Sequence, residues 1–409
     1  MFIKLAVRNL ARNFRRTLLT FLAIAIGLMF LLVLDSLLAG IDLESFQKII
    51  NFETGHIKIY ARGYDWRKEN FLLDKLLTRP AEVKEKLKPE PEVLGVAERI
   101  NFRIMLSDGV DQLPAVGLAI NPTEDESVFL LKNSVSSGEF LASATEEAML
   151  IGEGLAKDFG VGLGDYLTIL TRTRYETYQA LDLKIKGILK TEDPKIDWSA
   201  VVIPLGLGQK ALDLGQAVTE IDIKIKDPSR LEEFRDKLAK ELTGVEIVTW
   251  KDLAEDVVAI GEAKRGVSTL LFGSIVLIAL IGITNTILLA AFERAREIGT
   301  MMAMGMKRRE ILLLFVLEGA IIGVLGSATG CLLGALANLP LVIFGINWGV
   351  LMRDLGDIGY RIAGVSYGVW RPGMFLLVFV FGVVVSALVS IYPAWVASRL
   401  PPNEALRRI

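Results

Sequence analysis

Two side chains that commonly bind metals or take part in catalysis occur only once each in this chain. Cys331 lies inside an apolar run and His56 begins an alternating segment, so they offer no disulfide within the chain, no cysteine metal site and no catalytic triad. The motif G-x-x-x-x-G-K-[ST], which binds nucleotide phosphates, is also missing. We therefore expect no enzyme activity, no catalytic residue, no metal site and no cofactor site in this chain itself.

A charged stretch between two apolar segments is the most distinctive pattern. Residues 293–311 read ERAREIGTMMAMGMKRREI, with a basic cluster at Lys307, Arg308 and Arg309. Basic residues in short loops mark the cytoplasmic side of a membrane protein. We therefore expect this stretch to lie in the cytoplasm.

The apolar segments on either side of this stretch are expected to be transmembrane helices that position it. The chain is 52% hydrophobic, yet 23% of its residues are charged, and its mean hydropathy is +0.44. These values predict a membrane part and a separate soluble part, and the net charge of −2 argues against a nucleic-acid partner. A helix of about 20 apolar residues crosses a hydrocarbon core of about 30 Å. The four expected transmembrane helices are residues 17–41, 266–292, 311–336 and 373–394.

The distribution of basic residues predicts the orientation of these helices. The N-terminal segment 1–16, the loop 293–310 and the tail 395–409 are all basic, and four spans place all three in the cytoplasm. Residues 42–265 and the loop 337–372 then lie outside. The N-terminal segment has Leu5 and Leu10 amid basic residues, which predicts an amphipathic helix on the inner membrane surface.

Residues 42–265 have the patterning of a soluble α+β domain. Alternation at 56–60, 183–186 and 221–225 predicts strands, whereas the spacing at 231–238 predicts a helix. The fold class is therefore a four-helix membrane protein with a large extracytoplasmic α+β domain between its first two helices.

The third apolar segment carries small residues and one charge. Spacings of three and four residues let neighbouring helices approach closely, and we expect packing there through Gly319, Gly323, Gly326, Gly330 and Gly334. Glu318 in the same segment has either a structural partner or an interfacial position. A proton relay is disfavoured because no second carboxylate lies in the second or fourth segment.

Four motifs, in matching order, resemble the MacB/FtsX/LolC–LolE family of ABC-transporter permeases. They are the opening RNLARNFRRTLLT at 8–20, the run MLIGEGLAKDFGVGLGD at 149–165, the charged stretch REIGTMMAMGMKRREI at 296–311, and the tail YPAWVASRLPPNEALR at 392–407. The resemblance implies an outer domain of two lobes, namely a porter-like lobe at about 45–105 and 226–250 and an inserted β-rich lobe at about 106–225.

In that family the charged loop carries a short helix that docks on a separate ATPase. The resemblance therefore implies that a LolD-like cytoplasmic ATPase dimer binds the ATP and Mg²⁺, and that this chain transmits its closure to the outer domain. The residues expected to make this coupling are Arg296, Glu297, Ile298, Gly299, Gly305 and Arg308.

Within the family, the lipoprotein-releasing branch is favoured because the chain starts directly at the interfacial helix, whereas MacB carries a fused ATPase and FtsX a smaller outer domain. The connection 171–180 is short and lacks proline, so the chain resembles the hookless LolE type, and recruitment of a periplasmic chaperone stays open. Efflux of peptides or small molecules, and control of a cell-wall hydrolase, are the alternatives.

Lipoprotein cargo would need an apolar path out of the inner membrane. The expected lining is Met29, Phe30, Val33 and Leu34 on the first segment with Leu270, Leu271 and Ile275 on the second. The alternative is that these side chains only face lipid tails. A second permease is expected as a partner, and the sequence leaves open whether it is an identical copy.

Overall fold

The computed structural model describes residues 2–12, 14–67, 71–191, 193–293, 295–347 and 365–398. The chain forms two compact units. One, the sheet unit, holds residues 44–259. The other, the helical unit, holds the described residues of 2–43, 260–347 and 365–398.

The sheet unit is built on one ten-stranded sheet with the order β10-β1-β9-β2-β3-β8-β5-β7-β4, and β6 pairs with β2 and β7. The strands are β1 (Ile57–Ala61), β2 (Val93–Ser107), β3 (Gln112–Ile120), β4 (Val135–Gly138), β5 (Ala148–Gly152), β6 (Tyr166–Arg172), β7 (Tyr178–Leu189), β8 (Ala200–Pro204), β9 (Glu220–Ile225) and β10 (Val245–Thr249). Most neighbours are antiparallel, whereas β3 with β8 and β5 with β7 are parallel.

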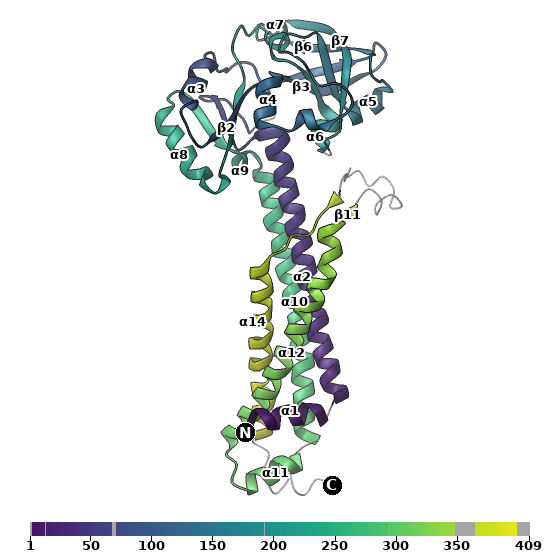
Figure 1. Cartoon of the computed structure of the whole chain (residues 1–409), viewed down its shortest axis with the longest axis vertical. Coiled ribbons are helices and arrows are strands. Elements are labelled where there is room, and N and C mark those ends of the chain that lie inside the picture. Colours follow the sequence, from purple (N-terminus) through teal and green to yellow (C-terminus); the bar gives the residue numbers. More distant parts are fainter. Residues whose placement is uncertain are drawn as a thin grey trace. The chain divides into compact units, whose positions relative to one another are not determined.

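Short helices surround this sheet (Figure 1). They are α3 (Pro80–Leu87), α4 (Pro122–Val128), α5 (Glu153–Phe159), α6 (Pro194–Ser199), α7 (Leu205–Ala211), α8 (Leu231–Glu241) and α9 (Trp250–Leu253), with the π-helical η1 (Ile49–Thr54) and the 3₁₀ turns η2 (Leu131–Ser134) and η3 (Pro228–Arg230). The predicted strands at 56–60, 183–186 and 221–225 and the predicted helix at 231–238 are confirmed as β1, part of β7, β9 and α8.

The predicted division into two lobes differs from the observed pairing at one strand. β9 was expected in the inserted lobe, but it lies between β1 and β2. The physical reason is its burial on both faces, since Ile221 and Ile223 point into the apolar core while Glu220 and Asp222 are buried with polar partners. The long strand β2, almost all of it within the predicted porter-like lobe, pairs with β9 through Val93–Arg99 and with β3 through Arg99–Ser107, two strands of the predicted inserted lobe.

The helical unit contains long helices (Figure 1). Its elements are α1 (Phe2–Arg12), α2 (Phe14–Lys48), α10 (Glu255–Glu293), α11 (Ala295–Ala303), α12 (Arg308–Ile343), the two-residue strands β11 (Ile346–Asn347) and β12 (Val365–Ser366), α14 (Pro372–Val389) and α15 (Ile391–Ser398). The last residues of α2 and the first of α10 belong to the sheet unit.

Three helical stretches are long and apolar enough to cross a membrane, namely Thr17–Thr54, Arg308–Ile343 and Pro372–Val396. The predicted span 266–292 falls within α10, a continuous helix of 39 residues. Many of its side chains lie outside the described residues, so the count of four spans stays a prediction.

The observed helices extend beyond the predicted spans. α2 begins at Phe14, inside the predicted interfacial segment, and continues to Lys48, where Glu44 and Lys48 form an ion pair of 2.9 Å one turn apart. α12 continues through Pro340 to Ile343 and stops before Gly345, whose φ is 66°. Hydropathy locates the apolar centre of such a helix but not the polar turns that continue it.

Candidate coupling site

The charged stretch folds into a short helix that ends in a glycine-dependent turn. Gly305 follows α11 with a φ of 98°. Its N–H donates to the carbonyl of Met302, and the N–H of Met306 donates to the carbonyl of Met301, both at 3.0 Å. These bonds form a Schellman motif, which requires a left-handed residue. Gly305 is needed for its backbone conformation alone, because a Cβ there would meet nothing within 4 Å.

The apolar face of α11 packs into the helical unit. Ile298 is 1% exposed and shares a cluster with Ile311 and Phe315 of α12 and Ala394 of α15. Gly299 beside it is also buried. The partly buried side chains that pack against this cluster include Leu10, Met301, Met302 and Met306. The short helix is thus held against α12 and α15 by apolar contacts.

Beyond α11, the chain presents an exposed basic tip, formed by Met304, Lys307, Arg308 and Arg309. Met304 is 76% exposed. The tip leads directly into α12, where the N–H of Lys307 donates to Oε2 of Glu310 at 2.7 Å. An exposed apolar side chain among cations is suited to binding an acidic protein surface that has an apolar pocket.

Two polar contacts connect α1 to this site. Nη2 of Arg12 lies 2.6 Å from Oε1 of Glu297 in α11, and Nδ2 of Asn9 donates to Oε1 of Glu318 in α12 at 2.7 Å. Neither Asn9 nor Arg12 was predicted as a site residue, although their spacing of three places them on one face of a helix. The predicted coupling residue Arg296 has its side chain outside the described residues.

Glu318 is 4% exposed and accepts the hydrogen bond from Asn9. Of the two alternatives predicted for Glu318, a structural partner and an interfacial position, the structure shows the structural partner. We predict that Glu318→Gln, which keeps an oxygen acceptor for Asn9, retains the stability of the wild type. Glu318→Leu should lower the free energy of unfolding by about 1–3 kcal/mol, because it leaves the amide of Asn9 unsatisfied. Unfolding of the detergent-solubilised chain by sodium dodecyl sulfate would measure both. Equal stability of the two variants would contradict the structural role.

The glycines of α12 predicted to pack lie close to neighbouring helices. A Cβ on Gly319 would lie 1.7 Å from Oγ of Ser390, and one on Gly323 would lie 2.7 Å from Cβ of Ser386. The other three face α2, where the nearest atoms to an added Cβ are Cγ2 of Ile24 at 3.0 Å for Gly326, the carbonyl oxygen of Ala25 at 2.9 Å for Gly330, and Cδ1 of Leu32 at 2.9 Å for Gly334.

The complementary small residues on α14 were not predicted from the sequence. Gly382 and Ser386 have the same spacing of four, and a Cβ on Gly382 would lie 2.2 Å from Oγ of Ser327 in α12. Both helices therefore contribute small residues to this contact.

The structure describes most of the side chains predicted to line a cargo path. On α2, Phe30 is 53% exposed, whereas Met29, Val33 and Leu34 are half-buried. On α10, Leu270 is 74% exposed and Leu271 is 48% exposed. The side chain of Ile275 lies outside the described residues.

Comparison with known proteins matches two family profiles to this chain. The FtsX-like permease C-terminal profile matches residues 269–402. The MacB-like periplasmic core domain profile matches residues 17–241, more than half of the 409 residues. The chain belongs to the MacB/FtsX/LolC–LolE family of ABC-transporter permeases. The resemblance found in the four sequence motifs is thereby confirmed.

Individual relatives of this permease include lipoprotein-releasing and macrolide-export proteins. The lipoprotein-releasing system transmembrane protein LolC of Xylella fastidiosa is 22% identical over 402 residues, which cover 94% of this chain and 92% of LolC. LolE of Haemophilus influenzae is 23% identical and covers 79% of this chain and 80% of its own length. The macrolide export ATP-binding/permease protein MacB of Brucella abortus is 25% identical over 99% of this chain and 60% of MacB.

Among solved structures, the periplasmic region of MacB from Actinobacillus actinomycetemcomitans is 13% identical, with a TM-score of 0.36, and covers 51% of this chain and 95% of that region.

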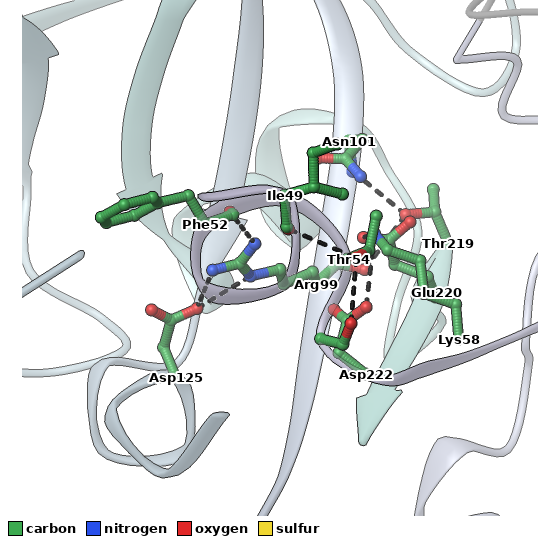
Figure 2. Close-up of polar contacts among 11 residues, drawn as sticks. Ile49, Phe52, Thr54, Lys58, Arg99, Asn101, Asp125, Thr219, Glu220 and Asp222 are labelled. Atoms are coloured by element: carbon green, nitrogen blue, oxygen red, sulfur yellow. Dashed lines mark hydrogen bonds and ion pairs between the residues drawn. The ribbon is translucent and has the colours of Figure 1, made fainter. Parts of the chain in front are cut away.

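The sheet unit of this permease buries charged side chains on adjacent strands. Nζ of Lys58 on β1 lies 2.5 Å from Oε1 of Glu220 and 3.3 Å from Oδ1 of Asp222, both on β9 (Figure 2). Burial and the neighbouring Glu220 carboxylate raise the pKa of Asp222 to about 8 against the opposing charges of Lys58 and Arg99. Folding therefore favours the protonated form of Asp222.

This proton predicts a pH-dependent stability. Asp222 titrates near 3.8 when unfolded and near 8 when folded, so only the folded state holds the proton between those values. The contribution of Asp222 protonation to the free energy of unfolding is complete below about pH 4. It is lost as the pH rises towards about 8, at up to about 1.4 kcal/mol per pH unit. Asp222→Asn should reduce this slope in thermal unfolding of the full chain, whereas Asp158→Asn at an exposed position should not. An unchanged slope in Asp222→Asn would refute the assignment.

Proposed function

We propose that this chain is the permease subunit of an ABC transporter that releases lipoproteins from the cytoplasmic membrane, driven by a separate ATPase. The observation that carries this proposal is the likeness to LolC, which extends over 94% of this chain and 92% of LolC. The protein has four membrane helices, with α10 as the second, and its termini lie in the cytoplasm. The basic residues of α1 and of the basic tip support this orientation.

The basic tip is the docking site for the ATPase dimer, which binds the ATP and Mg²⁺. Its exposed Met304 and three cations support this role, as does the packing of α11 behind it. Closure of the ATPase displaces α11. Because α11 is held to α1 by Arg12 and Glu297, and to α12 by the cluster around Ile298, that displacement reaches the membrane helices.

Lipoprotein cargo imposes a large energetic demand. Each buried methylene contributes about 0.8 kcal/mol, so exposing three acyl chains with roughly 40 methylenes to water would cost roughly 30 kcal/mol. The release path must therefore stay apolar. The exposed side chains of Phe30, Leu270 and Leu271 are candidates for its lining.

In this proposal, the chain does not itself recruit a periplasmic chaperone. β6 and β7 are joined by a tight turn in which the N–H of Thr173 donates to the carbonyl of Thr177 at 2.8 Å. A turn of this length projects no hook, and this favours the LolE type. The second permease of the transporter is either an identical copy or a related chain.

Gentle detergent purification of the tagged chain, followed by mass spectrometry of the bound proteins, tests this proposal. We expect a cytoplasmic ATPase and triacylated lipoproteins, and any second permease would be identified at the same time. Recovery of an ATPase with a cell-wall hydrolase, and without lipoproteins, would replace transport by a signalling function.

Efflux is the second candidate function, because the likeness to MacB of Brucella abortus covers 99% of this chain at 25% identity. Recovery of an ATPase together with a periplasmic adaptor, and without acylated cargo, would favour efflux of peptides or small molecules.

A further inference from the structure

The last turn of α2 ends inside the sheet unit in an unusual conformation. After Lys48 the chain continues as the π-helical turn η1, and Gly55 then ends it with a φ of 61°. The N–H of Gly55 donates to the carbonyl of Ile50 at 3.0 Å. Turns of this kind are rare and often occur at functional sites. The first membrane helix thus enters the sheet unit through η1.

The carbonyl groups of η1 are anchored by neighbouring elements of the sheet unit. Nη1 of Arg99, from the middle of β2, donates to the carbonyl of Phe52 at 3.1 Å (Figure 2). The N–H of Leu130 donates to the carbonyl of Asn51 at 3.0 Å. Carbonyls at the end of a helix lack partners within the helix, so these two bonds connect η1 to β2 and to the segment after α4.

Arg99 is itself held in one orientation. Its Nε and Nη2 lie 2.8 Å and 2.7 Å from Oδ1 of Asp125 in α4, and its Cζ lies 3.2 Å from the ring centroid of Phe129. Arg99 and Asp125 are each 1% exposed. A planar guanidinium fixed on one edge by a carboxylate presents its Nη1 in a defined direction. That direction is the carbonyl of Phe52.

The segment that leads to the second membrane helix is attached at the same place. The N–H of Trp250 in α9 donates to the carbonyl of His56 at 3.1 Å, and its ring lies 5.0 Å from that of Phe46 in α2. β10, which precedes α9, pairs with β1 along its whole length. Both chain segments that connect to membrane helices therefore meet around η1 and β1, and all of these contacts lie inside the sheet unit.

We propose that Arg99 is a positioning residue for energy coupling, because it fixes η1 to β2 so that a displacement of the first membrane helix moves the sheet. This inference rests on the proposed function for the source of the displacement. Without the bond from Arg99, η1 would lose its connection to β2 and keep only the bond from Leu130, so it would deform more easily and absorb more of the displacement.

The test removes this bond without leaving a buried charge. Replacement of a buried ion pair by apolar groups of similar size is often neutral for stability, so Arg99→Met with Asp125→Leu should fold. The control is Lys186→Met with Glu146→Leu, which removes a partly buried ion pair of 2.6 Å between β7 and the segment before β5. In the described part of the chain, neither residue of the control pair bonds to η1. Equal melting temperatures of the two double variants would establish that both fold.

Hydrogen exchange of β1 and β9 amides in the permease–ATPase complex, with and without ATP, is the readout. We expect ATP to change exchange of these strands in the wild type and in the control, and the change to be about tenfold smaller in Arg99→Met/Asp125→Leu at an unchanged rate of ATP hydrolysis. A full ATP response in the folded double variant would overturn the role of Arg99.

Failure of the proposed function gives a different pattern. If the wild type shows the ATP response but releases no lipoprotein, the cargo assignment is wrong and the role of Arg99 is still decided by the double variant. If ATP changes nothing in β1 and β9 of the wild type, the sheet is not driven from the membrane and the inference is wrong.

Discussion

Replacement of Gly305 by alanine should lower the amount of cargo released per ATP about tenfold while leaving ATP hydrolysis in place. Gly305 has a φ of 98° and supports the two bonds that end α11. A Cβ in the left-handed region costs roughly 1–2 kcal/mol, and about 1.4 kcal/mol corresponds to a factor of ten in the population of the native turn. The variant therefore weakens the turn that places the basic tip.

Gly305→Asn is the matched control, because asparagine adopts left-handed conformations more readily than other residues with a side chain. It adds a larger side chain than alanine at a position where a Cβ meets nothing within 4 Å. We expect Gly305→Asn to retain more coupling than Gly305→Ala. The reverse order, or full coupling in both variants, would show that the turn does not depend on the glycine conformation. Release and hydrolysis would be measured in the same reconstituted preparation.

Replacement of Gly330 by leucine should abolish the native packing of α12 on α2. A Cβ at Gly330 would lie 2.9 Å from the carbonyl oxygen of Ala25 and 3.0 Å from Cβ of Leu28. Neither atom belongs to a flexible side-chain end, so the helices must separate. Overpacking of this kind costs about 3 kcal/mol, and it also removes the close contacts on which association in lipid depends.

Ala328→Leu adds similar bulk to the exposed side of the same helix and should leave stability unchanged. The free energy of unfolding by sodium dodecyl sulfate, together with the fraction of monodisperse protein after purification, measures both variants. A Gly330→Leu protein as stable as Ala328→Leu would mean that α2 and α12 do not pack as described.

The sequence was sufficient to predict features that depend on local patterns. Alternation identified β1 and β9, helical spacing identified α8, and the glycines of α12 were expected at helix contacts, where the structure places them. The short helix α11 came from the resemblance to the permease family. Each of these features depends either on residues close together in the chain or on a motif that forms the same structure throughout the family.

Features that depend on distant residues were not predictable. The pairing of β9 between β1 and β2 joins segments more than a hundred residues apart, and alternation does not specify a partner. The bond from Asn9 to Glu318 spans most of the chain. The ion pair between Arg99 and Asp125 required β2 and α4 to be in place, since neither residue belongs to a recognisable motif.

Release of triacylated lipoprotein from reconstituted membranes is the most direct test of the account. The permease, its ATPase and lipoprotein cargo would be placed in liposomes, and cargo in the aqueous phase would be measured with ATP, without ATP, and with the Gly305→Ala variant. The account predicts ATP-dependent release by the wild type and about tenfold less by the variant. ATP hydrolysis by a stable complex that releases no lipoprotein would contradict it.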